Sequence, residues 1–132
     1  MPILIVDDSA TMRKLIANHL AEVGLRNVDE AQDGPDAVAL AARKPYRCVF
    51  LDITLPGMNG LEVLKAIRGS GNRAPVVVVT SDSSVRLLTQ AFQAGASAFV
   101  QKPFDKATFL RKARQAMGME TEALGTTSPA LV

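Results

Sequence analysis

The sequence has few residues that could staple a small protein together. Its 132 residues include one cysteine and one histidine, and no tryptophan. A chain of this length buries roughly two-thirds of its unfolded surface on folding. We therefore expect one domain with a self-supporting core that needs neither a disulfide nor a structural metal. With no second histidine in the chain, His19 is better explained as a surface or boundary residue than as a metal ligand.

Long apolar runs and a one-sided charge are also missing. No apolar run approaches the ~20 residues of a spanning helix, and the N-terminus lacks the flanks of a signal peptide. The 15 basic and 13 acidic residues leave a net charge of +2, too even to indicate nucleic-acid binding by charge alone. Cys48 lies in an apolar stretch, where a free thiol acts as a small hydrophobe in a reducing compartment. These features predict a cytoplasmic protein with neither a membrane nor a nucleic acid as partner.

The dominant pattern is an alternation of apolar runs of strand length with segments of helical period. This alternation is typical of βαβ units around a parallel sheet and predicts an α/β fold with five β/α pairs. The expected strands are Ile3–Val6, Val28–Ala31, Arg47–Asp52, Val76–Val79 and Ala98–Gln101.

Turn and cap residues mark the expected helices between these strands. The first runs from about Ala10 to Val23, with Met12, Leu15, Ile16, Leu20 and Val23 on one face. The second follows the turn at Asp33-Gly34-Pro35, and Asn59 with Glu62 forms a capping box for the third. Asp82 is expected to cap the fourth, which runs through Val85, Leu88 and Phe92 to Gly95. Asp105 caps the fifth, with Phe104 and Phe109 as a hydrophobic staple.

The end of the chain has a different character. From Gly118 onward there is no sustained period and there are many helix breakers. We expect residues 1–117 to form one domain and residues 118–132 to form a mobile C-terminal tail.

Four of the apolar strands end abruptly in polar residues. Because the carboxyl ends of parallel strands share one edge of a sheet, these residues should converge on one crevice. They are Asp7, Asp8, Asp52, Thr80 and Lys102.

Such a cluster needs positive charge. Two carboxylates 4 Å apart repel by roughly 4 kcal/mol at an effective dielectric of 20. Oxygen ligands without His or Cys nearby suit Mg²⁺, which with Lys102 would balance the three carboxylates. Such a site can accept a phosphoryl group, with Thr80 donating a hydrogen bond. Asp52, alone at the tip of the middle strand, is the best candidate nucleophile.

These residues lie in motifs that resemble the receiver domains of the two-component response-regulator family, and within it the stand-alone chemotaxis regulators. The resemblance covers about Pro2 to Met117. Each motif is weak alone, but their order and spacing together are specific. The motifs are Val6-Asp7-Asp8-Ser9 with Thr11-Met12-Arg13, Glu30 to Gly34, Asp52 to Gly60, Gln93 to Ala96, and Lys102-Pro103-Phe104.

The resemblance implies a doubly wound (βα)5 flavodoxin-like three-layer sandwich with strand order 2-1-3-4-5, an order that the general rules for such folds give for this family. Asp52 would take a phosphoryl group from a phosphohistidine on a histidine kinase or phosphotransfer protein. Asp7, Asp8, Asp52 and the backbone carbonyl of Thr54 would hold Mg²⁺. Lys102 would pair with the phosphoryl group, and the Lys102-Pro103 peptide would be cis.

The resemblance also implies a switch. Phosphorylation would draw Thr80 toward the new oxygens, and Phe99 would turn into the space behind it. This movement would alter the surface of the fourth helix, fifth strand and fifth helix, where a downstream partner binds. The protein would act by binding, as a monomer, and would catalyse only its own phosphorylation and dephosphorylation. A phosphatase is a further implied partner.

The sequence departs from the pattern of the similar chemotaxis regulators in three respects, which involve four residues. Phe99 stands where a tyrosine is common, so a contact through a phenolic hydroxyl is lost. Thr54 and Asp82 occupy positions that modulate dephosphorylation. Ser81 replaces a smaller residue after Thr80, which could hinder access to the phosphoryl group.

Simpler interpretations exist for each residue taken alone. Asp7-Asp8-Ser9 could be a capped turn, Thr80 and Ser81 could cap a helix, and Phe99 could be ordinary core. The combination with Asp52 and Lys102 favours the site.

Rival functions also remain. A Mg²⁺-dependent phosphatase of the aspartate-nucleophile type needs a carboxylate where Thr54 stands. Nucleotide or flavin binding lacks a glycine-rich phosphate loop. Within the receiver class, a chemotaxis regulator acting on a flagellar-motor component, a shuttle in another phosphorelay and a receiver cut from a longer protein stay open.

Overall fold

Five β/α units follow one another along the chain. The structure, a computed structural model, describes residues 1–119. Its strands are β1 (Ile3–Val6), β2 (Val28–Ala31), β3 (Cys48–Leu51), β4 (Val76–Thr80) and β5 (Ala98–Gln101). Its helices are α1 (Ala10–Glu22), α2 (Gly34–Arg43), α3 (Gly60–Gly69), α4 (Val85–Gln93) and α5 (Lys106–Ala116). The predicted alternation is confirmed. From residue 120 onward, the predicted tail lies outside the described residues.

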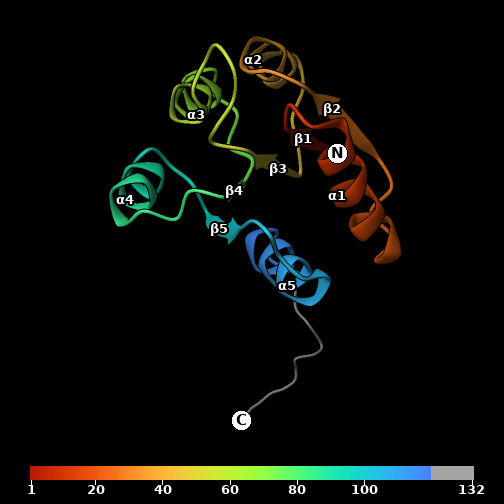
Figure 1. Ribbon diagram of the computed structural model, residues 1–132. Coiled ribbons are helices and arrows are strands. Elements are labelled where there is room, and N and C mark those ends of the chain that lie inside the picture. Colours follow the sequence, from red (N-terminus) through yellow and green to blue (C-terminus); the bar gives the residue numbers. More distant parts are fainter. Residues whose placement is uncertain (120–132) are drawn as a thin grey trace.

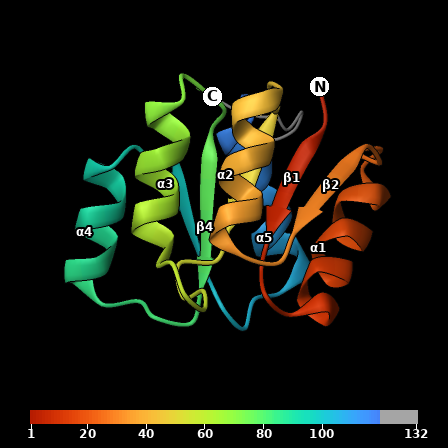
Figure 2. The same cartoon turned by 90° about the horizontal axis from the view of Figure 1, so that it is seen from above.

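The strands form one parallel sheet of order β2-β1-β3-β4-β5. Helices α2, α3 and α4 cover one face, and α1 and α5 cover the other (Figure 1). The predicted flavodoxin-like three-layer sandwich and its strand order are confirmed. Figure 2 shows the strands from the side, with the arrowheads of β1 and β2 at the same edge. We call the edge where the strands end the carboxyl edge, and the opposite one the amino edge.

The core lies on both faces because the inner strands are apolar throughout. Leu4 and Val6 pack with Val49 and Leu51 beneath α2 and α3. The alternate residues, Ile3 and Ile5, pack with Phe50 and Val77 beneath α1 and α5. All residues of β1, β3 and β4 are buried, as expected for strands covered on both sides.

Short polar side chains cap the helices. Ser9, Asp33 and Asp105 each accept a hydrogen bond from a backbone N–H of the first turn. Asn59 and Glu62 form the predicted capping box of α3, with both reciprocal bonds present. The phenyl rings of Phe104 and Phe109 stack with centroids 5.2 Å apart, which confirms the predicted apolar contact at the start of α5.

The predicted cap of α4 was wrong. Its N-cap is Ser84, whose hydroxyl accepts from the N–H of Leu87 at 3.3 Å. Asp82 instead closes the preceding turn by accepting from the N–H of Ser84 at 3.0 Å. Val85 and Phe92, on the expected helix, are 79% and 47% exposed. The buried contacts of this helix come from Ala91 and Leu87.

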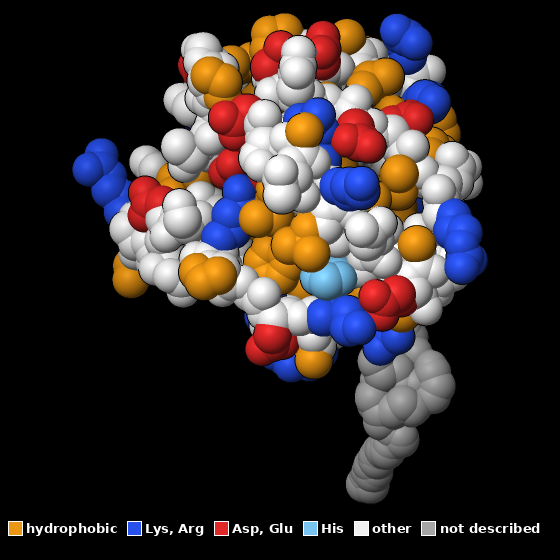
Figure 3. Space-filling view, turned by 45° about the vertical axis from the view of Figure 1, so that its right-hand side comes forward, with side chains coloured by type: hydrophobic (Ala, Val, Ile, Leu, Met, Phe, Trp, Pro, Cys, Tyr) orange, Lys and Arg blue, Asp and Glu red, His pale blue; other side chains and the backbone are white. Residues whose placement is uncertain are grey.

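Helix α1 lies against α5 at the edge of the core. The imidazole of His19 contacts the rings of Phe104 and Phe109, at centroid distances of 6.3 and 5.8 Å. This histidine, pale blue in Figure 3, is at the surface beside hydrophobic side chains, as its boundary assignment predicted. Leu15, predicted on the buried stripe, is 39% exposed. Among residues 1–119, no helix is both long and apolar enough to cross a membrane.

Candidate functional site

Asp7 and Asp8 follow β1 directly, and their side chains have different surroundings. The carboxylate of Asp7 is buried and accepts from the N–H of Ser9 at 2.9 Å. Asp8 is exposed. One carboxylate is therefore held rigidly inside the crevice, and the other lies at its mouth.

Asp52 follows β3, the neighbour of β1 in the sheet. Its N–H donates to the carbonyl of Val6 at 2.9 Å, so the two strand ends are joined just before the acidic residues. Asp52 is buried, with its side chain 8% exposed, and Oδ1 accepts from the N–H of Thr54 at 2.9 Å. The parallel register thus places Asp52 beside Asp7 at the carboxyl edge.

The predicted acidic cluster is present. Asp7, Asp8 and Asp52 each offer an oxygen atom, and these atoms lie within 4.8 Å of one another. The donors are carboxylate oxygens, which suit a hard cation such as Mg²⁺ better than a softer metal. The residues present therefore fit the predicted metal.

Lys102 provides the positive charge within the cluster. It follows β5, and its N–H donates to the carbonyl of Thr80 at 2.8 Å across the neighbouring strand. Its ammonium group donates to Asp7 Oδ2 at 2.7 Å and to Asp52 Oδ2 at 3.1 Å. The Lys102-Pro103 peptide is cis, as the resemblance implied.

Burial and charge shift the pKa values of this pair. Burial lowers the pKa of Lys102, but its hydrogen bonds and ion pairs with Asp7 and Asp52 outweigh burial and raise it. Burial raises the pKa of the Asp52 carboxyl, and the charge of Asp7 adds to this effect. The N–H of Thr54 and the ammonium group of Lys102 oppose the rise. The raised pKa keeps Lys102 charged at neutral pH, and its charge favours the ionised form of Asp52.

The side chains of Thr80 and Phe99 form no hydrogen bond with the side chains of this cluster among residues 1–119. Thr80 is fully buried at the end of β4, and its Oγ1 accepts from the N–H of Asp82 at 3.3 Å. Among the described residues, no hydrogen bond joins it to Asp52. Phe99 pairs with Val78 in the sheet and packs with Ile53 and Leu87 beneath α4. Because Val78 and Thr80 point to the same side of β4, Thr80 and Phe99 share that face.

Two residues of the site received no role from the sequence. Arg13 on α1 donates to the carbonyl of Asp7 at 2.6 Å and to Glu30 Oε1 at 2.7 Å, which ties the acidic turn to β2. Gly60 donates its N–H to the carbonyl of Ile53 at 2.8 Å. A Cβ at Gly60 would clash with the Cα of Ile53. Both residues occur in the receiver-like motifs, but only the fold reveals what they contact.

The fold and the site together indicate the class of protein. A parallel five-stranded sheet with three carboxylates and a lysine at its carboxyl edge is the arrangement expected of a receiver domain. The sequence profile of the response regulator receiver domain matches residues 3–114. The chain belongs to this family.

Within the family, the chain is similar to chemotaxis regulators. It is 37% identical to chemotaxis protein CheY-3 of Vibrio cholerae over 114 residues, which cover 85% of this chain and 88% of the relative. It is 38% identical to chemotaxis protein CheY of Pseudomonas aeruginosa over 106 residues, which cover 79% and 86%.

A solved structure of another receiver domain has the same fold. The receiver domain of a sensor histidine kinase from Pseudomonas aeruginosa, with a magnesium ion in its active-site cleft, superposes with a TM-score of 0.79. The two chains are 29% identical, and the match covers 89% of this chain and 97% of that one.

Proposed function

We propose that the chain is a phosphorylation-activated signalling switch in which Asp52 accepts a phosphoryl group from a phosphohistidine. The observation that carries this proposal is the ammonium group of Lys102, which bridges Asp7 and Asp52 at the carboxyl edge. A cation held between an acidic cluster and a candidate nucleophile is suited to neutralise the oxygens of a transferring phosphoryl group.

Mg²⁺ is the proposed cofactor. Asp7, Asp8 and Asp52 would hold it, and the backbone carbonyl of Thr54 is proposed as a further ligand. When bound, the ion would supply positive charge for the phosphoryl oxygens. Lys102 and the bound ion would then together balance the negative charges of the carboxylates and the phosphoryl group.

In the proposed transfer step, the carboxylate of Asp52 is the nucleophile. Oδ1 is held by the N–H of Thr54, which fixes the orientation of the carboxylate. An oxygen of this carboxylate attacks phosphorus while the bond from phosphorus to the donor imidazole breaks. The electron pair of that bond returns to the imidazole nitrogen, and an aspartyl phosphate remains. Lys102 would pair with a phosphoryl oxygen. In this proposal the protein catalyses only its own phosphorylation and dephosphorylation.

The proposed switch connects this charge change to a surface. Phosphorylation takes Asp52 from a charge of −1 to about −2. The hydroxyl of Thr80, which now accepts from the N–H of Asp82, would donate to a phosphoryl oxygen instead. Its movement would free space on the face that it shares with Phe99, so that Phe99 could turn inward. The surface of α4, β5 and α5 would change for a downstream partner.

The partners and setting are proposed from the similarity to chemotaxis regulators. The donor would be a histidine kinase or a histidine phosphotransfer protein, and the target a flagellar-motor component. A phosphatase could end the signal. We propose a cytoplasmic monomer whose receiver unit is residues 1–117. A shuttle role in another phosphorelay would use the same site.

The test is intact mass spectrometry after incubation with Mg²⁺ and acetyl phosphate. The wild-type chain should gain one phosphoryl group that hydroxylamine removes, and a chelator should prevent the gain. Asp52→Asn should gain none. Asp36→Asn is the matched control, because Asp36 is an exposed carboxylate in the first turn of α2.

Three results would contradict the proposal. A phosphoryl group that persists in Asp52→Asn would place the acceptor elsewhere. No adduct and no donor hydrolysis would indicate a receiver that signals unphosphorylated. Steady hydrolysis of many phosphate esters would indicate a phosphatase.

A further inference from the structure

A cavity lies at the amino edge of the sheet, away from the acidic cluster. Its volume is about 530 Å³, within the range of small-ligand pockets. One wall is the segment from the end of α2 to the start of β3, and the other joins α3 to β4. Asp52 lies at the far end of β3, so the length of the strand separates the cavity from the proposed phosphorylation site.

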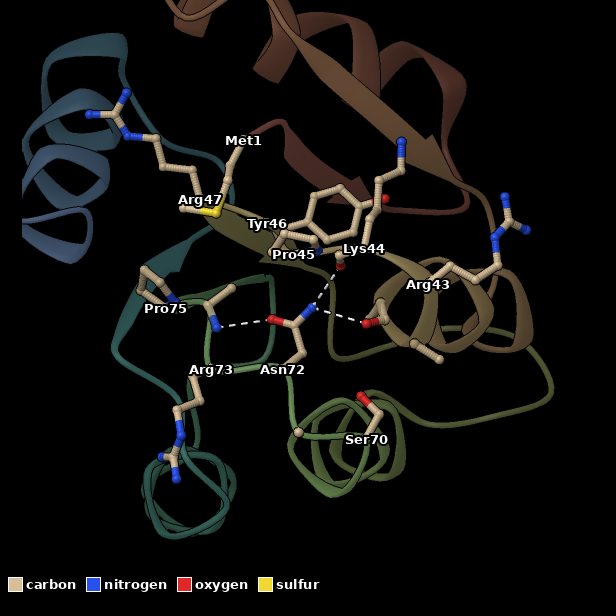
Figure 4. A pocket seen from close by; sticks show the side chains of 14 residues that line it. Met1, Arg43, Lys44, Pro45, Tyr46, Arg47, Ser70, Asn72, Arg73 and Pro75 are labelled. Atoms are coloured by element: carbon tan, nitrogen blue, oxygen red, sulfur yellow. Dashed lines mark hydrogen bonds between the residues drawn. The ribbon is translucent and has the colours of Figure 1, made fainter.

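Hydrogen bonds hold the two walls together. The amide of Asn72 donates to the carbonyls of Ala41 and Lys44 at 3.0 and 3.2 Å (Figure 4). Its side-chain oxygen accepts from the N–H of Ala74 at 3.0 Å. Arg68 donates to the carbonyl of Ala74 at 2.7 Å from beneath the second wall. The cavity is therefore formed before any ligand arrives.

The rim of the cavity carries positive charge. None of the described residues that line it has an acidic side chain. Four of the lining side chains are cationic, those of Arg43, Lys44, Arg47 and Arg73, and Met1 adds the α-amino group. Lys44 is paired with Asp29 at 2.8 Å. The three arginines are exposed, and none forms an ion pair with another residue in the range 1–119. Their charges are available to an anionic ligand.

The arrangement of these charges indicates the shape of that ligand. Figure 4 shows Arg43, Arg47 and Arg73 on three different sides of Asn72, with their guanidinium groups pointing away from one another. A compact polyanion would need cations that converge on one point, which these do not. A ligand with separated negative charges can reach all three.

The interior of the cavity is less polar than its rim. Pro45, Pro75 and Ala74 line it, together with the ring of Tyr46. Tyr46 is fixed by the bond from its hydroxyl to Asp29 Oδ2 at 2.7 Å. An apolar side chain can therefore pack against Ala74 and the two prolines while neighbouring carboxylates face the arginines.

We propose that this cavity binds an acidic peptide segment of a partner protein, with one apolar side chain in the cavity and flanking carboxylates on the arginines. Exposed ion pairs are individually weak, so the rim would mainly supply specificity and speed of association. The site is independent of Asp52 phosphorylation.

The test uses Tyr46 as an internal reporter, because the chain contains one tyrosine and no tryptophan. The probe is the acetylated and amidated peptide Asp-Glu-Leu-Glu-Asp, titrated at low salt while tyrosine fluorescence and binding heat are recorded. Removing the charges of Arg43, Arg47 and Arg73 with glutamine should weaken binding about 2- to 5-fold each, and about tenfold or more together.

Matched controls distinguish an effect of the three rim arginines from an effect of the net charge of the protein. The triple variant Lys65→Gln, Arg86→Gln, Arg111→Gln removes the same charge from exposed positions outside the cavity and should bind as wild type does. A peptide with leucine replaced by serine, and one with amides in place of carboxylates, should bind more weakly. Circular dichroism of each variant checks that the fold is retained.

Several results would overturn the proposal. Equal binding by both triple variants would show a net-charge effect only. Pyrophosphate that competes as well as the peptide would indicate a small-anion site. If Glu120→Gln/Glu122→Gln alone changes the fluorescence of Tyr46 without peptide, the chain's own acidic residues occupy the cavity. No signal at millimolar peptide would exclude the site.

Discussion

At the scale of single residues, the site depends on one lysine shared by two carboxylates. The side chains of Asp7 and Asp52 are almost fully buried, and that of Lys102 is 18% exposed. Breaking such a contact leaves buried carboxylates without their cation. The lysine is therefore needed for stability as well as for the proposed chemistry.

The corresponding prediction concerns Lys102→Met, which keeps most of the length of the side chain and removes its charge. Without metal, the free energy of unfolding should fall by about 1–3 kcal/mol, and Mg²⁺ should restore part of it because it supplies the missing charge. Urea unfolding with and without Mg²⁺ measures both effects.

The control is Lys106→Met, because Lys106 pairs with Glu22 where both side chains are about half exposed, at 51% and 53%. Loss of that surface pair should cost less than about 1 kcal/mol and should not respond to Mg²⁺. Equal losses in the two variants would contradict the shared-lysine argument.

At the scale of elements, the loop after Asp52 is fixed by the first residue of α3. Gly60 approaches the backbone of Ile53 so closely that a side chain has no room. At Gly69, the other end of the same helix, an added Cβ would have no heavy atom within 4 Å. One helix thus offers a crowded glycine and an open one.

We predict opposite effects of alanine at these two positions. Gly60→Ala should lower the free energy of unfolding by about 1–3 kcal/mol, since the loop must shift to accept the methyl group. It should also slow phosphorylation of Asp52, because the loop carries the N–H of Thr54 that orients the carboxylate. Gly69→Ala should be neutral or stabilising by up to about 1 kcal/mol. Urea unfolding and the mass assay measure both, and a stable, fully active Gly60→Ala would refute the argument.

At the scale of the whole molecule, the sheet protects its central thiol. Cys48 is fully buried in β3, and burial raises its pKa to about 12. The thiol ionises near pH 8.5 in an unfolded chain. The fold therefore excludes the thiolate until the whole domain opens.

The sign of the pH dependence follows from this difference. The folded pKa is raised, so the contribution of Cys48 to stability is complete below about pH 8.5. Between that pH and about 12, the unfolded state loses protons that the folded state keeps, and stability falls by up to about 1.4 kcal/mol per pH unit.

Unfolding curves at several pH values should show this decline, with a shallower slope for Cys48→Ala. Iodoacetamide at pH 8 should label Cys48 only in denaturant. Rapid labelling of the folded chain would contradict full burial.

Much of the fold was predictable because its signals are local. A strand buried on both faces must be apolar throughout, as Val76–Val79 is, and the cap at Asn59 with Glu62 needs residues only three apart. The prediction of the α4 cap failed because a local signal was ambiguous there. Asp82 and Ser84 can each accept a hydrogen bond from a backbone N–H, and the position of the helix, with Ala91 and Leu87 in the core, makes Ser84 the cap.

The alternation of strands and helices, and the polar residues at the strand ends, could be predicted from the residues alone, because both depend on neighbours along the chain. Three features became visible only in the folded chain. Lys102 bridges Asp7 and Asp52, Arg13 donates to the Asp7 carbonyl, and three arginines line one cavity at the amino edge. These contacts join residues far apart in sequence. Their distances are set by the order and register of the strands, which no local pattern specifies.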